Sequence, residues 1–177
     1  MLDTSVSERH TLSILVDNEP GVLARVVGLF SGRGYNIESL TVSEVDEARH
    51  QSRISVVTSG TPIVIEQIKK LLARLVPVHS VQDLTIGSAH VERELALVKT
   101  MNTGNKRVEA LRVADSFRAR TLDSTLNSFV FEVTGNSSKV TAFIELMSSL
   151  GDVEVARTGV CGMTRGNKID MSSQPVM

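Results

Sequence analysis

Residues 10–30 read HTLSILVDNEPGVLARVVGLF and contain the signals of a strand, a turn and a helix. From residue 10 to 16, apolar side chains at alternate positions share one face, which predicts a half-buried strand. After a turn at residues 17–21, apolar residues recur at helical spacing as far as Phe30. Pro20 suits the first turn of a helix. The segment therefore predicts the opening β-α part of a mixed domain.

The rest of the chain extends this order and then repeats it. In the first half we expect further strands at residues 36–45, 53–58 and 78–86, and a helix introduced by Thr61-Pro62. In the second half we expect strands at 94–100, 121–124, 128–134 and 152–163, and helices at 106–118 and 139–150. Each half reads β-α-β-β-α-β, an order that folds into a four-stranded antiparallel sheet with both helices on one face. The fold class is therefore α+β, with two tandem βαββαβ domains.

The domain boundaries follow from where the apolar periodicity stops. We expect a flexible N-terminus at residues 1–8, a first domain at 9–86 and a linker at 87–91. A second domain at 92–165 and a polar tail at 166–177, predicted to be disordered, complete the chain. Because each domain leaves an edge strand unpaired, association of two copies is expected on physical grounds.

Composition argues against several classes of partner. The net charge of -1 gives no broad attraction for phosphate backbones, and aromatic residues at 3% leave few rings for stacking on bases, so no nucleic acid is expected. Cys161 is the single cysteine and cannot form an internal disulfide. Neither a signal peptide nor an apolar run of about 20 residues is found, which predicts a cytoplasmic protein without membrane insertion.

Catalytic and metal-binding motifs are absent from the sequence. The four histidines, His10, His50, His79 and His90, lack metal-ligand spacing, so we expect no metal site and no catalytic residue. Glycines at 28, 32 and 34 lie within and beyond the predicted helix rather than between a strand and a helix, which excludes a dinucleotide-binding motif.

The turn at residues 17–21 is the candidate binding site. A helix N-terminus attracts anions, and Gly21 leaves room for a ligand to approach its backbone N–H groups. Asn18 offers an amide to a ligand ammonium, and Ile37 offers apolar surface. These groups match a free amino acid with an apolar side chain. An ordinary capped helix is the other interpretation that these residues allow.

Three segments resemble the small regulatory subunits of acetohydroxyacid synthase. They are residues 10–26, residues 29–40 (LFSGRGYNIESL) and residues 91–99 (VERELALVK), and the similarity extends over residues 9 to 166. The resemblance implies an N-terminal ACT domain followed by an ACT-like domain, both of them ferredoxin-like units. It also implies a homodimer formed through ACT domains, with valine, or leucine or isoleucine, bound between protomers.

By the pattern of that family, one chain would line the effector with four residues and its partner with two. The first set is Asn18, Gly21, Val22 and Leu23, and the second is Asn36 and Ile37. The resemblance further implies a large catalytic subunit that uses thiamine diphosphate, magnesium and FAD to make acetolactate from pyruvate, so those cofactors belong to the partner and none belongs to this chain. Feedback inhibition by valine and activation of the catalytic subunit are the implied roles.

The second domain departs from this pattern, because its turn at residues 101–106 lacks the Pro-Gly-Val-Leu sequence. A second valine site is therefore not expected there, and its surface would contact the catalytic subunit or pack in a dimer. An RNA-binding module of the same topology would need aromatic residues on its central strands, and residues 53–57 contain none. The sequence also lacks the Arg and Asn pair of an acylphosphatase and a DNA-reading element.

Overall fold

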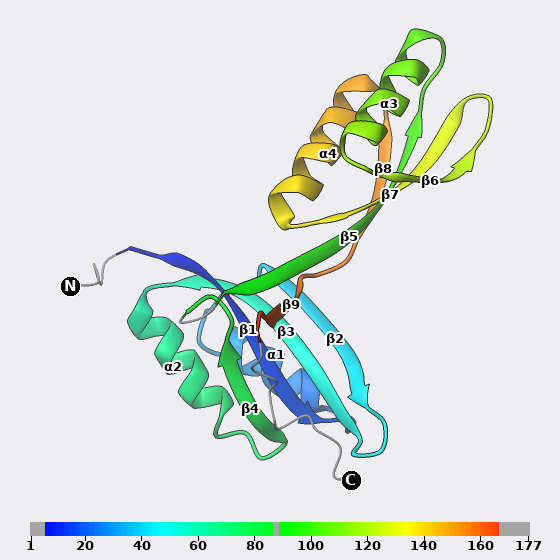
Figure 1. Cartoon of the computed structure of the whole chain (residues 1–177). Coiled ribbons are helices and arrows are strands. Elements are labelled where there is room, and N and C mark those ends of the chain that lie inside the picture. The colour runs from blue at the N-terminus through cyan, green and yellow to red at the C-terminus, as the bar shows by residue number, and fades with distance from the viewer. Residues whose placement is uncertain (1–5, 87–88, 167–177) are drawn as a thin grey trace. The chain divides into compact units, whose positions relative to one another are not determined.

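The computed structural model describes residues 6–86 and 89–166, which form two compact units (Figure 1). The first unit contains the chain up to Val91 and again from Val160 onward, and the second unit contains Glu92–Gly159. The structure therefore confirms an α+β fold of two βαββαβ units, although the chain returns to the first unit after completing the second.

The first unit has the predicted order of strands and helices. Its elements are β1 (Glu8–Asp17), α1 (Val22–Ser31), β2 (Ser39–Asp46), β3 (Gln51–Gly60), α2 (Pro62–Leu72) and β4 (Val78–Asp83). The sheet order is β2-β3-β1-β4, with every neighbouring pair antiparallel. The two edges of this sheet are β2 and β4, so β2 presents an unpaired side to the outside of the sheet.

The core of the first unit lies between this sheet and its two helices. Leu12 and Ile14 of β1 are fully buried against Phe30 of α1 and Ile68 of α2. The other face of β1 is buried as well, so the strand is buried on both faces rather than half-buried as predicted. The period of two along the strand and the helical period along α1 thus bury the apolar positions that the sequence marks. This packing fixes the end of β1 and the start of α1, and hence the turn between them.

The second unit repeats the arrangement. Its elements are β5 (His90–Met101), α3 (Asn105–Ser116), β6 (Arg120–Ser124), β7 (Ser128–Gly135), α4 (Ser137–Leu150) and β8 (Val153–Arg157), with the sheet order β6-β7-β5-β8. Its core is aromatic: Phe131 lies 5.1 Å from Phe129 and 6.2 Å from Phe143 between ring centroids. These phenylalanines therefore pack the core rather than form a surface for stacking on bases.

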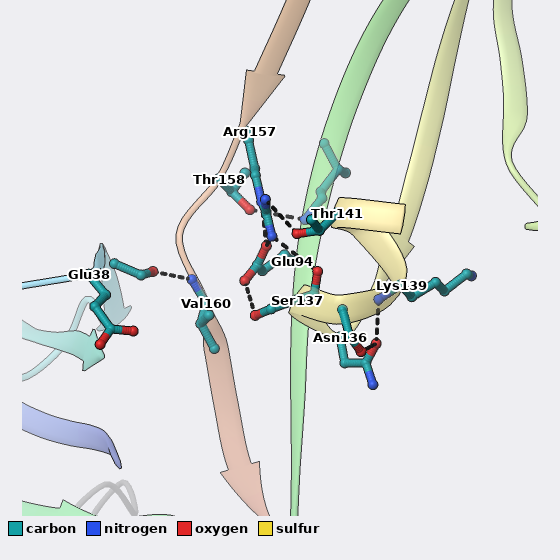
Figure 2. A network of polar contacts seen from close by, with 12 residues as sticks. Glu38, Glu94, Asn136, Ser137, Lys139, Thr141, Arg157, Thr158 and Val160 are labelled. Atoms are coloured by element: carbon teal, nitrogen blue, oxygen red, sulfur yellow. Dashed lines mark hydrogen bonds and ion pairs between the residues drawn. The ribbon is translucent and has the colours of Figure 1, made fainter. Parts of the chain in front are cut away.

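A buried carboxylate joins β5, β8 and α4 in the second unit (Figure 2). Glu94 accepts hydrogen bonds from Arg157 Nε at 2.6 Å and from the Ser137 hydroxyl. Arg157 Nη1 also donates to Thr141 Oγ1 at 3.1 Å. Because Glu94 is almost fully buried, this charge needs the guanidinium and the hydroxyl as partners, and the network fixes the start of α4 against two strands.

One predicted strand is wrong. Residues 152–163 do not form a single strand closing the second sheet; the chain forms β8, leaves the strand at Thr158 and Gly159, and then forms β9 (Cys161–Thr164). Residues from Val160 onward belong to the first unit, where Val160 N–H donates to Ser39 Oγ of β2 at 2.8 Å. By its contacts, the second unit thus runs to Gly159, and the residues that follow pack with the first unit through long-range pairing that periodicity does not reveal.

Smaller differences concern the ends of elements. The second strand begins at Ser39 rather than at residue 36, and His90 and Val91, expected to be linker, already belong to β5. Residues 87 and 88 of the expected linker, residues 1–5 of the expected flexible terminus and residues 167–177 of the expected tail lie outside the described residues. Gly34 takes a left-handed φ of 71° after α1, whereas Gly32 keeps a helical φ of -65°.

Candidate functional site

The turn between β1 and α1 presents open space at the start of a helix. Gly21 is the N-cap residue of α1 and has a left-handed φ of 86°, a conformation that favours glycine. A Cβ built at this position would meet no heavy atom within 4 Å. Asn18, Glu19 and Pro20 are exposed beside it. The glycine is therefore required by the backbone, and the space around it is available to a ligand.

The helix start has unsatisfied capacity for an anion. The helical hydrogen bonds of α1 begin with Arg25 N–H, which donates to the Gly21 carbonyl at 3.0 Å. The N–H groups of Leu23 and Ala24 precede that bond and so lack an acceptor within the helix. No side chain caps this end, and no acidic residue lies in the first turn. A ligand carboxylate would meet the positive end of the helix dipole here.

Apolar surface lies next to these polar groups. Val22 is buried in the core of the first unit, whereas Leu23 is 41% exposed. Ile37 is half-buried and packs against the same core. Of the predicted site residues, Leu23 thus offers accessible apolar surface at the turn. The Val22 side chain instead anchors the start of α1 in the core.

The two halves of the predicted site lie at opposite ends of the sheet. Asn18 follows the end of β1, where Asp17 pairs with Gln51. The Asn36 carbonyl accepts a hydrogen bond from Thr58 Oγ1 at 2.7 Å, and Thr58 pairs with the other end of β1, at His10. At about 3.3 Å per residue, the β1 residues at these two ends are about 23 Å apart. A single chain therefore does not bring Asn36 and Ile37 to the turn.

Two neighbouring strands hold the turn in place. Asn18 N–H donates to the His50 carbonyl at 2.6 Å, and Asp17 N–H donates to the Pro77 carbonyl at 2.9 Å. The Asp17 carboxylate lies 2.6 Å from His79 Nε2. The sequence analysis missed these residues, because a backbone carbonyl leaves no signature in the type of its side chain and because the pairs are distant along the chain.

The corresponding turn of the second unit is built differently. The Asn102 side chain is buried, and its Oδ1 accepts a hydrogen bond from Thr100 Oγ1 at 2.5 Å, so this amide is engaged by the protein itself. The guanidinium of Arg107, in the first turn of α3, lies over the ring of Phe129 at 3.9 Å from its centroid. These contacts engage the Asn102 amide and the Arg107 guanidinium within the protein, although a Cβ at Gly104 would meet no heavy atom within 4 Å, as at Gly21.

The described residues show neither a metal cluster nor a membrane helix. Within residues 6–86 and 89–166, no three His, Cys, Asp or Glu residues gather in a way that could hold a metal ion. In the same part of the chain, no helix has the length and apolar character needed to cross a membrane.

Comparisons with known proteins match both units. A family described as "AHAS small subunit-like ACT domain" matches residues 12–80, and one described as "Small subunit of acetolactate synthase" matches residues 93–166. The chain is 48% identical over 160 residues to a probable acetolactate synthase small subunit of Archaeoglobus fulgidus, covering 90% of this chain and 99% of the relative. It is 46% identical to the acetolactate synthase isozyme 3 small subunit of Escherichia coli, covering 91% of this chain and 98% of the relative.

A solved structure has the same fold over nearly the whole chain. The crystal structure of the acetolactate synthase small subunit from Thermotoga maritima superimposes with a TM-score of 0.82 at 38% identity, covering 91% of this chain and 99% of that one. The fold and the family match thus define a protein built on an ACT domain, a class that fits a regulatory role. Within that class, the chain belongs to the family of acetolactate synthase small subunits.

Proposed function

We propose that this chain activates a catalytic acetolactate synthase subunit and makes it sensitive to valine. Membership of the small-subunit family supports a catalytic partner, and the first unit supports a ligand site. The observation that carries the effector proposal is the exposed turn at Asn18 and Gly21, which joins an uncapped helix start to the accessible side chain of Leu23.

Valine fits this turn through three kinds of contact. Its carboxylate accepts hydrogen bonds from the N–H groups at the start of α1, where the helix dipole favours negative charge. Its ammonium group donates to side-chain amide oxygens such as that of Asn18, and its isopropyl group contacts Leu23 and Ile37. Leucine and isoleucine share the first two contacts, so the size of the apolar space would set the preference among the three.

A homodimer formed through the ACT domains would complete the site. A two-fold axis across paired first units places one chain's Asn18 end beside the other chain's Asn36 end, which a single chain separates by the length of the sheet. Exposed small residues at one helical spacing, Ala24 and Gly28 of α1 and Gly32 at its C-cap, would let two helices approach closely. Valine bound between the chains would then favour one arrangement of the dimer over another.

The catalytic partner would supply the chemistry. In this proposal the large subunit holds thiamine diphosphate, magnesium and FAD and condenses two pyruvate molecules to acetolactate, in the cytoplasm, while this chain holds none of these groups. Inhibition requires only that valine binds the restrained state of the complex more tightly than the active state. A difference of about 1–3 kcal/mol would give useful feedback, and by linkage the catalytic subunit would change valine affinity by the same factor.

The test is acetolactate formation from pyruvate by the cognate catalytic subunit alone, with this chain, and with this chain plus valine. We expect a higher rate with the chain and a loss of that rate as valine is added. Activation without valine sensitivity would reject the effector proposal and leave the subunit role. An unchanged rate with a folded chain and an active catalytic subunit would reject the activating role.

A further inference from the structure

The hairpin turn between β2 and β3 contains a residue in an unusual backbone conformation. His50 has a left-handed φ of 50°, and among the described non-glycine residues only Arg118 shares a positive φ. The turn is closed by its own hydrogen bonds: Arg49 N–H donates to Asp46 Oδ1 at 3.1 Å, and His50 N–H donates to the Glu47 carbonyl at 3.2 Å. A left-handed histidine costs free energy, so the surrounding structure must maintain it.

The left-handed residue faces the candidate site through its backbone. Its carbonyl accepts the hydrogen bond from Asn18 N–H at 2.6 Å, and the next residue, Gln51, begins β3 opposite Asp17. The His50 side chain is exposed, so burial of the imidazole does not hold the turn. What His50 provides is its carbonyl, which the left-handed backbone conformation places opposite the Asn18 N–H.

Comparison with the second unit shows which part of the Asn18–His50 contact is common to both units and which is found only in the first. There, Asn102 N–H donates to the Asn127 carbonyl at 2.9 Å, which is the equivalent bond. Among described residues, Asn127 is not one of those with a positive φ. The bond is thus common to both units, whereas its left-handed acceptor is found in the first unit.

We infer that His50 is a positioning residue for the effector site, acting through its left-handed backbone on Asn18. The inference rests on the proposed function for its ligand. Four exposed residues, Asn18 to Gly21, lie between β1 and α1. Core packing fixes the two elements that they join, and the hydrogen bonds to the His50 and Pro77 carbonyls, just before β3 and β4, hold the start of the turn itself. Turning the His50 carbonyl away would break its hydrogen bond with the Asn18 backbone N–H. The Asn18 side chain could then move away from the ligand's ammonium group.

Substitutions at this position separate backbone from side chain. Glycine and asparagine adopt a left-handed φ readily, whereas a β-branched residue does not. In calorimetric titrations of the full chain with valine, we expect His50→Gly and His50→Asn to keep the wild-type Kd within about twofold, and His50→Val to raise it on the order of tenfold. Rescue by two residues that lack the imidazole would assign the effect to the backbone.

Arg118→Val is the matched control, because it introduces the same kind of backbone strain at a φ of 54° in the second unit. We expect it to lower the melting temperature and leave the valine Kd unchanged. If Arg118→Val weakens valine binding as much as His50→Val does, general destabilisation explains the effect and the inference is overturned. His50→Ala, with a smaller backbone penalty, replaces His50→Val if the latter does not fold.

Hydrogen exchange of the Asn18 amide provides a readout that does not depend on valine. We expect this amide to be protected in the wild type and in His50→Gly, and to exchange on the order of tenfold faster in His50→Val. Wild-type protection in a folded His50→Val protein would overturn the inference. A wild-type chain that binds no valine would instead reject the proposed effector, and the exchange rates would still decide whether His50 positions the turn.

Discussion

At the scale of single residues, Gly21 serves both the backbone and the proposed ligand. Its φ of 86° permits the tight entry into α1, and the missing side chain leaves the helix start open. Gly104, the N-cap residue of α3, is its counterpart in the second unit, with a φ of 59° and equally open space. The same substitution at Gly21 and at Gly104 introduces similar backbone strain, so a loss of valine response at Gly21 alone would indicate a direct effect on the ligand.

Gly21→Asp should abolish the valine response, because a carboxylate at the helix start repels the ligand's own carboxylate and occupies its space. We expect at least a tenfold increase in the valine concentration that gives half-maximal inhibition. A tenfold increase corresponds to a loss of about 1.4 kcal/mol of binding free energy. Gly104→Asp is the control. It should lower stability and leave that concentration unchanged, and an equal loss of valine response in both variants would argue against a ligand at Gly21.

Sequence reasoning reached residues whose type carries information and missed those that act through the backbone. Gly21 and Asn18 follow from the preference of glycine for positive φ and from the chemistry of an amide. The role of His50 depends on its φ and on its carbonyl, neither of which a histidine in a polar hairpin turn indicates. The occupied Asn102 amide was equally hidden, because Thr100 engages it only once the strand is formed.

At the scale of elements, the helices differ in how their first turns are satisfied. Asn136 caps α4 by accepting a hydrogen bond from Lys139 N–H at 3.0 Å. Thr61 occupies the same position before α2, yet its hydroxyl makes no capping hydrogen bond there. Among the described helices, α1, α2 and α3 begin without a side-chain cap, so an uncapped start alone does not distinguish α1.

Asn136→Ala should cost about 1 kcal/mol of unfolding free energy, the usual loss on removing a side-chain cap. Thr61→Ala removes no such bond and should change stability by less than about 0.5 kcal/mol. Urea denaturation followed by circular dichroism measures both. Equal losses would show that the Asn136 bond contributes nothing beyond the intrinsic preference of the position.

The sequence predicts the strands and helices themselves more reliably than it predicts which strands pair with each other. The order of the first twelve strands and helices follows from periodicity and turn residues, because each pattern is local. The place of β9 does not follow from local patterns, because this strand has only the residues 161–164 and pairs with β5, which is distant in the sequence. Asn36 was expected in a strand for a similar reason, although pairing of β2 begins only at Ser39.

At the scale of the whole molecule, the separation of Asn18 and Asn36 allows a test of whether two chains share one site. Asn18→Ala and Asn36→Ala homodimers would each lack one residue in both sites. A heterodimer of the two variants, isolated with two affinity tags, would contain one intact site and one site that lacks both residues. We therefore expect the heterodimer to recover about half the wild-type valine capacity by calorimetry.

A heterodimer that binds valine as weakly as either homodimer would show that each site is confined to a single chain. The homodimers themselves should still activate the catalytic subunit, since neither substitution removes a core side chain. Loss of activation in both would indicate that the same surface contacts the catalytic partner.

Because the chain returns to the first unit at Val160, that unit is built from two segments that are far apart in the sequence. The second unit is an insertion: β5 leaves the first unit and the segment after Gly159 comes back to it, where Val160 is buried and Arg165 N–H donates to the Ala89 carbonyl at 2.8 Å. A fragment that stops before Val160 thus removes a piece of the first unit as well. Conversely, excising Glu92–Gly159 and rejoining the ends, rather than truncating, is how an autonomous first unit would be made.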